Sequence, residues 1–572
     1  MTDPGSLTAE LSDAVDRWMA ADDEYRTDLA ALLEDDRAEL ARLFDGRIAF
    51  GTAGLRAAMG PGPRQMNRLV VQQTTAGLMD WLPAGAKVVI GYDARYHSKT
   101  FAQDVARVVT TRGGTAELID RPAPTPVLAR AVLDRSADAG VMITASHNPA
   151  TDNGYKLYLA DGIQLVSPAD GEIADAIDRV VEAGPGVGSS ASDADRGAGN
   201  TAAADVPDIA DRAIDSHRST AIAALLTDHR DVAVLYTAMH GVGGRHMVSC
   251  FEQAGFPAPI VVSEQFDPDP DFPTAPFPNP EEPGAFDLAY ATIERLPPGS
   301  VDIILANDPD ADRLAVGIAG DDGRWRRLSG DEVGALLIDH VLRHTERPPA
   351  GAGADLVASS IVSSRFIDRL AEAAGVESIR TLTGFKWVAR PIVERPGDRF
   401  LLGYEEALGY CIGDRVRDKD GISAALVMAE LAAECKASGS TVSRRLDELI
   451  EQHGLYATSQ VTVSIAGLDD AGRTAAKERA VSLDPPEIGG VAVVEREDLA
   501  LGERLPPTSG VVLQLADGSR LIVRPSGTEP KIKAYLEVIE DGGPAGNAEE
   551  ARRRAELRLE QLARAAEALL VD

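Results

Sequence analysis

The chain has 572 residues and a mass of 60.4 kDa, several times the size of a typical single domain, which excludes a small interaction module. Its 44% hydrophobic and 26% charged residues are typical of a packed globular protein. The formal net charge of −33, from 57 basic and 90 acidic residues, disfavours nucleic acids and anionic membrane surfaces as main partners.

The cysteines and the N-terminal residues point to a cytoplasmic location. Cys250, Cys411 and Cys435 are too few and too widely spaced to build a disulfide framework or a zinc site. The first residues are acidic where a signal peptide would be basic, and no run of about 18 apolar residues occurs. We therefore expect a cytoplasmic protein that is not secreted and does not span a membrane.

The chain begins with helical periodicity and continues with alternating strands and helices. Between residues 7 and 44, apolar residues recur at helix-like spacing, which predicts a leading helical layer. Strand-like and helical stretches then alternate, in the order 87–93 (strand), 100–112 (helix), 115–120 (strand), 126–134 (helix) and 139–144 (strand). This alternation predicts α/β layers around a largely parallel sheet.

A linker and three further units follow. Residues 183–206 are rich in glycine, serine and aspartate, which predicts a flexible linker. The strand–helix rhythm then returns twice, with strand-like runs at 231–237, 259–264, 301–307, 356–362, 378–383 and 399–405. From about residue 455 the pattern becomes that of an α+β unit, closed by a charged helix at 549–570. We therefore expect an α/β protein with three similar mixed α/β domains and a smaller α+β C-terminal domain, with bounds at 1–212, 213–325, 326–452 and 453–572.

An acidic turn lies between the apolar runs VDIILA and LAVGIA. Asp308, Asp310 and Asp312 alternate along it, and carboxylates in such a turn can converge on one hard cation, of which Mg²⁺ is the best candidate. A turn rich in aspartate and asparagine without a metal is the alternative. An EF-hand fits poorly, because Arg313 and Ala319 occupy its required glycine and glutamate positions.

A serine follows the strand AGVMIT, in the segment TASHNP. Ser146 therefore lies at the carboxyl end of a strand, where open α/β sheets bind ligands, and its hydroxyl could accept or donate a phosphoryl group beside a metal ion. A serine/asparagine turn ended by proline is the alternative. Because adjacent side chains on an extended chain point apart, we do not expect His147 to form a couple with Ser146.

Two later loops carry polar groups suited to a phosphorylated sugar. In RPSGTEP, after the strand RLIV, the residues able to grip a phosphate are Arg524, Ser526, Gly527 and Thr528. In GYEEALGY, Glu405 and Glu406 could accept hydrogen bonds from sugar hydroxyls. A plain hairpin turn and two solvated glutamates are the respective alternatives.

Taken in order, GTAGLR, TASHNP, DPDADR, GYEEALGY and RPSGTEP closely resemble the motifs of the α-D-phosphohexomutase superfamily, the phosphoglucomutases and phosphomannomutases. The resemblance extends from about residue 45 to 540. With DNGYKLY, these motifs look closest to the branch that includes phosphopentomutases and glucose-1,6-bisphosphate synthases. The resemblance implies an active site in a central cleft between the domains.

The resemblance also implies roles for individual residues. Ser146 matches the phosphorylated serine, and Asp308, Asp310 and Asp312 match Mg²⁺ ligands that the serine phosphate completes. The candidate catalytic residues are Ser146, His147, Lys156, Arg56 and Lys419, with Lys156 or Lys419 expected to move the proton. The candidate substrate-binding residues are Arg313, Lys386, Glu405, Glu406, Arg524, Ser526, Gly527 and Thr528.

The implied activity is that of a phosphosugar mutase, an isomerase. It would interconvert the 1-phosphate and 6-phosphate of glucose or mannose through a phosphoserine and a bisphosphorylated sugar. Many hexomutases have G-E-E-S in the sugar loop, whereas Ala407 and Leu408 follow the glutamates here, which removes one hydroxyl contact. A phosphopentomutase or a glucose-1,6-bisphosphate synthase is therefore the main alternative, ahead of an Mg²⁺-dependent sugar phosphatase and a non-catalytic sugar-phosphate binder. The partners implied are sugar monophosphates and the bisphosphate intermediate.

Overall fold

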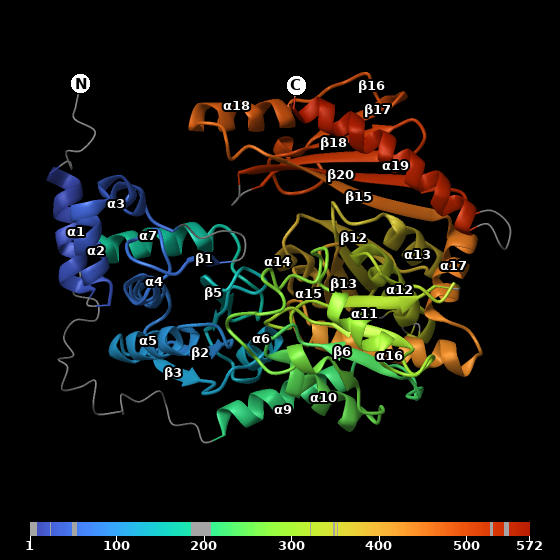
Figure 1. Ribbon diagram of the computed structural model, residues 1–572, viewed down its shortest axis with the longest axis horizontal. Helices are drawn as coiled ribbons and strands as arrows, with labels where there is room; N and C mark the ends of the chain where they lie inside the picture. The colour runs from blue at the N-terminus through green and yellow to red at the C-terminus, as the bar shows by residue number, and fades with distance from the viewer. Residues whose placement is uncertain are drawn as a thin grey trace.

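The computed structural model describes residues 9–571 except 23, 49–53, 185–207, 321, 347, 348, 350, 352, 527–529 and 543–547. Nearly all of the expected linker at 183–206 lies outside the described residues. The chain forms four units, which Figure 1 shows in the order of its colours, from the blue N-terminal unit to the red C-terminal unit. None of the described helices is both long enough and apolar enough to span a bilayer.

The first unit consists of a helical layer and a mixed sheet. Helices α1 (Ala9–Ala21), α2 (Arg26–Asp35) and α3 (Arg37–Leu43) confirm the predicted leading layer. Their side chains Trp18, Leu29 and Leu40 are buried in one hydrophobic core with the sheet. The sheet contains β1 (Leu55–Ala58), β2 (Lys87–Tyr92), β3 (Thr115–Leu118), β4 (Ala139–Ile143) and β5 (Asp152–Leu159), and its helices are α4 (Arg68–Trp81), α5 (Ser98–Thr111), α6 (Thr125–Asp134) and α7 (Ala169–Glu182).

The second unit has the same alternation of strands and helices. Its elements are α9 (Ile209–Ile222), β6 (Val234–Thr237), α10 (Gly243–Ala254), β7 (Ile260–Val261), η1 (Ser263–Gln265), α11 (Asp287–Glu294), β8 (Ile303–Ala306), β9 (Ala315–Ala319) and β10 (Trp325–Arg327).

The third unit begins and ends with long helices. Its elements are α12 (Gly330–His344), β11 (Asp355–Ser360), α13 (Phe366–Ala374), β12 (Glu377–Thr381), α14 (Phe385–Val388), α15 (Pro391–Glu394), β13 (Arg399–Glu405), β14 (Gly409–Ile412), α16 (Gly421–Ala437) and α17 (Val442–His453). The second and third units share one large hydrophobic core, to which α16 contributes on all sides.

The first three sheets repeat one topology. Their strand orders are β1-β5-β4-β2-β3, β10-β9-β8-β6-β7 and β12-β11-β13-β14. In each, three consecutive strands lie parallel with the first in the middle, and the next strand pairs antiparallel with the third. The predicted parallel arrangement is thus confirmed for three strands of each sheet. The antiparallel strands make the sheets mixed, so the predicted triplicate of similar mixed domains is also confirmed.

The fourth unit is an antiparallel sheet with helices, which confirms the predicted α+β class. It contains β15 (Leu455–Ser464), α18 (Asp470–Val481), β16 (Glu487–Ile488), β17 (Val491–Asp498), η2 (Leu499–Leu501), β18 (Val511–Leu515), β19 (Arg520–Pro525), β20 (Lys531–Glu540) and α19 (Ala548–Val571). The strand order is β15-β20-β19-β18-β17-β16. Buried Leu562 and Ala566 of α19 pack in the same core as the strands. Figure 1 shows α19 beside the sheet at its upper right.

Replacing Leu29 by alanine tests whether the helical layer belongs to the first unit's core. Leu29 is fully buried, so Leu29→Ala should lower the free energy of unfolding of that unit by about 2–5 kcal/mol. Thermal unfolding followed by circular dichroism would show an earlier first transition. The control Leu557→Ala removes a leucine that is 58% exposed and should leave the curve unchanged. Equal curves for wild type and Leu29→Ala would contradict this packing.

Candidate active site

The predicted loops occupy equivalent turns of the three mixed sheets. Ser146 lies between β4 and β5, the aspartates between β8 and β9, and Glu406 between β13 and β14. Each turn connects the third parallel strand to the antiparallel strand, at the carboxyl edge where α/β sheets bind ligands. Each also contains a residue with left-handed backbone, namely Ser146 (φ 52°), Ala311 (φ 55°) and Leu408 (φ 63°).

Ser146 lies directly beside the acidic turn of the second unit. Its hydroxyl Oγ donates to Asp308 Oδ2 at 2.8 Å, although 162 residues separate them. The serine side chain is almost fully buried, and its backbone N–H is held by Thr144 Oγ1 at 2.9 Å. The structure therefore brings the predicted nucleophile and the predicted metal ligands into one buried cluster.

His147 contacts Ser146, contrary to our expectation. The imidazole Nδ1 lies 3.2 Å from Ser146 Oγ. The expectation assumed an extended chain, whereas the left-handed backbone of Ser146 turns the two neighbouring side chains toward each other. Burial, together with the charges of Arg313 and Arg56, lowers the pKa of His147 well below its usual value. His147 is therefore a neutral imidazole beside the hydroxyl at neutral pH.

The three aspartates form an oxygen cluster suited to a hard cation. One oxygen from each lies within 4.8 Å of the others, and all three side chains are buried. Asp310 Oδ1 and Asp312 Oδ1 have no hydrogen-bond partner, a costly state for a buried carboxylate oxygen that coordination of a cation would relieve. Burial and the two neighbouring carboxylates raise the pKa of Asp308 well above its usual value.

Two lysines from other units neutralise this cluster. Lys156, on β5, donates to Asp310 Oδ2 at 2.6 Å and to Asp312 Oδ2 at 2.8 Å. Lys419, just before α16, lies 3.3 Å from Asp312 Oδ2. Although burial opposes the shift, the carboxylates raise the pKa of both lysines, so both remain ammonium ions at neutral pH.

The arginines expected near a reacting phosphate border the same turns. Arg56, on β1, donates to Asn148 Oδ1 at 3.4 Å in the serine turn, and its buried Nε has no hydrogen-bond partner. Arg313 donates through its backbone N–H to Asp308 Oδ1 at 3.0 Å and pairs with Glu281 at 3.1 Å. An isolated bridge joins Arg313 to Gly409 and connects the turns of the second and third units.

The glutamates of the sugar loop are held on separate partners. Glu405 Oε1 accepts from the backbone N–H of Gly384 at 2.7 Å, and Glu406 Oε2 accepts from the Ser363 hydroxyl at 3.0 Å. Burial and the neighbouring Glu405 raise the pKa of Glu406 to about 8. Lys386 is not part of the aspartate cluster in the described structure, because its Nζ donates to the carbonyl of Leu165 at 3.0 Å.

The predicted phosphate loop lies at the end of β19. Arg524 donates to Thr383 Oγ1 in the third unit and, at 3.4 Å, to Thr508 Oγ1 in its own unit. The backbone N–H of Ser526 donates to Lys531 O at 2.9 Å. Gly527 and Thr528 lie outside the described residues. Arg524 thus reaches the third unit just before α14.

Family models match this chain in all four parts. The models are those of phosphoglucomutase/phosphomannomutase: the α/β/α domain I at residues 47–183, domain II at 217–320, domain III at 329–453 and the C-terminal domain at 486–553. The chain belongs to the phosphoglucomutase/phosphomannomutase family. It is therefore a phosphosugar mutase, an isomerase.

Relatives of this mutase carry several substrate names. The phosphopentomutase of Homo sapiens is 34% identical and covers 96% of this chain and 94% of its own. The "Probable phosphomannomutase" of Haemophilus influenzae is 39% identical, with 82% of this chain and 93% of that protein covered. The solved structure of parafusin, a phosphoglucomutase from Paramecium, matches the fold with a TM-score of 0.63 at 19% identity, covering 91% of this chain and 95% of that one.

The mutase also holds its site with residues that the motifs did not indicate. Arg95, after β2, donates to the carbonyls of Ser146 and Asn148 at 2.6 Å each and so fixes the serine turn. Thr125, at the start of α6, donates to Asp310 Oδ2 at 2.6 Å. Asp418 lies 3.1 Å from Lys419 Nζ. Arg95 and Thr125 follow the carboxyl ends of predicted strands, and that position could have marked them as candidate site residues.

The raised pKa of Glu406 predicts a pH-dependent stability. Because this pKa is about 8 in the folded chain and ordinarily 4.5, the folded state binds more protons than the unfolded state between these values. Stability contributed by the protonated carboxyl is therefore lost as the pH rises through this range. The Tm of wild type minus that of Glu406→Gln should fall from about pH 5 to 8 and then level off.

Thermal unfolding of both proteins across that range would test this expectation. Glu372→Gln is the matched control, because the Glu372 side chain is 74% exposed. The difference in Tm between wild type and Glu372→Gln should not fall over this pH range. A flat difference between wild type and Glu406→Gln would contradict the raised pKa.

Proposed function

We propose that this mutase interconverts the 1-phosphate and the 6-phosphate of a hexose, glucose or mannose, through phosphorylated Ser146 and a sugar bisphosphate. The observation that carries the proposal is the 2.8 Å contact between Ser146 Oγ and Asp308 Oδ2 in a buried cluster of three carboxylates. A serine hydroxyl in that position can transfer a phosphoryl group where water is largely excluded. The partners would be sugar monophosphates and the bisphosphate intermediate.

Mg²⁺ is the proposed metal. Asp308, Asp310 and Asp312 would hold it, because they offer only oxygen ligands and because two of their buried oxygens lack hydrogen-bond partners. When bound, Mg²⁺ would neutralise charge on the phosphoryl oxygens. Lys156 and Lys419 would add positive charge from the other side of the cluster.

The transfer requires a proton acceptor as well as charge stabilisation. The bond from phosphorus to Ser146 Oγ breaks, a bond to the sugar hydroxyl oxygen forms, and that hydroxyl loses its proton. The resemblance assigns the proton to Lys156 or Lys419, but both are ammonium ions in this arrangement. We propose that one oxygen of the transferred phosphoryl group carries this proton to Ser146 Oγ, so that the serine leaves as a neutral hydroxyl. The neutral imidazole of His147, 3.2 Å from Ser146 Oγ, would accept the serine proton in the return step, when Ser146 attacks the bisphosphate.

The reaction also needs a second site for the phosphate that is not transferred. Arg524, with Ser526, Gly527 and Thr528, would bind that group, while Glu405 and Glu406 would accept hydrogen bonds from sugar hydroxyls. The bisphosphate would then turn round, so that its other phosphate faces Ser146. Arg524 is suited to this role because its hydrogen bond to Thr383 places it beside the unit that carries the two glutamates.

A pentose is the second candidate substrate. Ala407, directly after Glu406, is half-buried and offers a methyl group where many hexomutases have a serine hydroxyl. A smaller sugar phosphate would not need that contact. The relative that is named phosphopentomutase supports keeping this candidate.

The proposed nucleophile is tested by Ser146→Ala. Removing it should reduce isomerisation of glucose 1-phosphate, mannose 1-phosphate and ribose 1-phosphate by at least about a thousandfold with Mg²⁺ present. The rate of each isomerisation and the release of free phosphate would be recorded together. Ser263→Ala, which removes an exposed serine of the second unit, is the control and should retain wild-type rates.

The same assay separates the alternatives. Isomerisation that survives in Ser146→Ala would overturn the phosphoserine mechanism. Stoichiometric release of free phosphate by wild type would instead identify a phosphatase, and accumulation of bisphosphate without monophosphate product would identify a bisphosphate synthase.

The sugar preference is tested by Ala407→Ser. The new hydroxyl should add about one hydrogen bond to a hexose, which is worth about 0.5–1.5 kcal/mol. The kcat/KM for glucose 1-phosphate should therefore rise about two- to tenfold relative to that for ribose 1-phosphate. Steady-state kinetics on both substrates would measure the ratio, with Ala407→Gly as the control that adds no hydroxyl. If Ala407→Ser leaves the ratio of the two kcat/KM values unchanged, Ala407 does not determine the sugar preference.

A further inference from the structure

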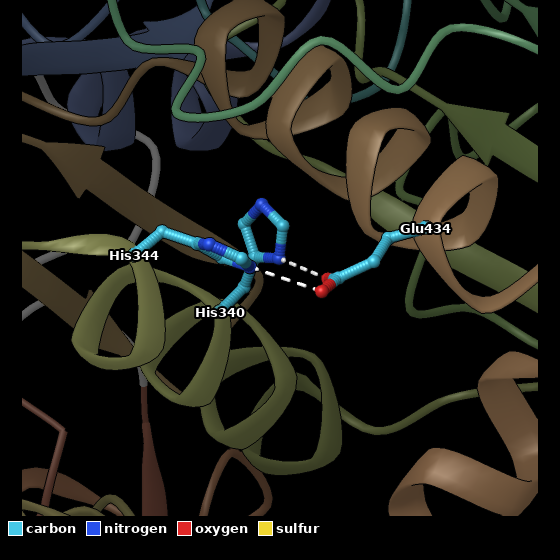
Figure 2. Close-up of side chains that lie close together, drawn as sticks. All are labelled: His340, His344 and Glu434. Atoms are coloured by element: carbon cyan, nitrogen blue, oxygen red, sulfur yellow. Dashed lines mark hydrogen bonds and ion pairs between the residues drawn. The ribbon is translucent and has the colours of Figure 1, made fainter. Parts of the chain in front are cut away.

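A second cluster of potential metal ligands lies in the third unit, outside the proposed active site. His340 and His344 are four residues apart on α12, so their side chains share one face of that helix. Glu434, in the last turn of α16, faces them, and Figure 2 shows the two imidazoles and the carboxylate converging between the two helices. One atom from each lies within 4.8 Å of the others.

The hydrogen bonds of His340 leave its second ring nitrogen without a partner. Its Nε2 lies 2.9 Å from Glu430 Oε2. Glu430 is a buried carboxylate that already accepts from the backbone N–H of Leu226 and of Thr227 and from Arg230, so it can only accept from the imidazole. His340 Nε2 therefore donates to Glu430, and Nδ1 is the ring nitrogen left to face the cluster.

The second ring nitrogen of His340 is fully buried beside the cluster. His340 is 0% exposed, and its Nδ1 has no hydrogen-bond partner although it lies 3.2 Å from Glu434 Oε2. A buried ring nitrogen without a hydrogen bond is costly, and a bound metal ion would satisfy it. A histidine oriented by a carboxylate on its other nitrogen is the usual arrangement of metal-ligating imidazoles.

The distances fit a tetrahedral ion. Bonds of about 2.0–2.2 Å in a tetrahedral site place neighbouring donor atoms about 3.3 Å apart. The His340 Nδ1 to Glu434 Oε2 distance is 3.2 Å, and the His344 Nε2 to Glu434 Oε1 distance is 3.1 Å. Each imidazole is therefore at the required separation from one oxygen of Glu434, and the side chains must shift for both imidazoles to reach the same ion.

The charges of the cluster also suit metal binding. Arg343 donates to both oxygens of Glu434, at 2.8 and 3.0 Å, and holds the carboxylate in place. Arg343 Nη1 also lies 3.3 Å from His344 Nε2, so the guanidinium would have to move from that nitrogen when a metal ion binds.

We propose that His340, His344 and Glu434 form a binding site for a divalent transition-metal ion, with Zn²⁺ the best fit to two imidazoles and one carboxylate. The His344 and Glu434 side chains are 25% and 21% exposed, so water can enter and occupy the fourth position. The ion would join the C-terminal ends of α12 and α16. Because Lys419 lies just before α16, this link would stabilise the helix that follows it.

Zn²⁺ binding to the full-length chain in excess Mg²⁺ tests the proposal by isothermal titration calorimetry. Wild type should bind one Zn²⁺, and His344→Ala should weaken this binding at least about tenfold. His229→Ala, which removes an exposed histidine, is the matched control and should bind as wild type does. Zn²⁺ should raise the Tm of wild type but not that of His344→Ala.

Two further measurements decide where the ion binds and whether a failure is structural. Asp310→Asn, which alters the aspartate cluster, should retain the Zn²⁺ binding that His344→Ala loses. His344→Ala should keep the circular dichroism spectrum and mutase activity of wild type, which excludes misfolding. Absence of Zn²⁺ binding to wild type would overturn the proposal. Binding lost in Asp310→Asn but kept in His344→Ala would also overturn it.

Discussion

The arrangement of this mutase depends on three carboxylates buried within one turn. Asp308, Asp310 and Asp312 repel one another, and a buried charge is costly unless it is paired. Their partners come from elsewhere: Ser146 and Lys156 from the first unit and Lys419 from the third. No single unit can therefore complete the cluster, and its charges also hold the three units together.

The repeated topology explains how these groups come to meet. Each mixed sheet reverses direction after its third parallel strand, and each reversal supplies one kind of polar group: a hydroxyl, three carboxylates, or a pair of glutamates. The Arg313–Gly409 bridge joins the second turn to the third, and Ser146 Oγ joins the first turn to the second through Asp308. The same local solution, used three times, builds a composite site from segments that are far apart in the sequence, since 162 residues separate Ser146 from Asp308.

Much of this could be predicted from the sequence, because strands and turns are local patterns. The buried strands, the leading helical layer and the motif loops are where periodicity and turn residues placed them. The antiparallel strand that follows the third parallel strand of each sheet was missed, because the direction of pairing is set by tertiary contacts. The position of Lys156 on such a strand, β5, was missed with it. Asp418 was missed for a related reason: it acts through hydrogen bonds to distant side chains, which leave no local signature. The amine of Lys386 likewise meets a carbonyl 221 residues away.

The left-handed backbone of Ser146 explains why the expectation that Ser146 and His147 point apart was wrong. Such a conformation in a non-glycine residue is often taken as strain stored for catalysis. Here Ala311 and Leu408 adopt it at the corresponding turns, and neither can act as a nucleophile. The conformation is therefore a property of the reversal from parallel to antiparallel pairing, shared by all three sheets. Its chemical consequence is positional: it turns Ser146 Oγ toward both His147 Nδ1 and Asp308 Oδ2, which an extended chain would keep apart.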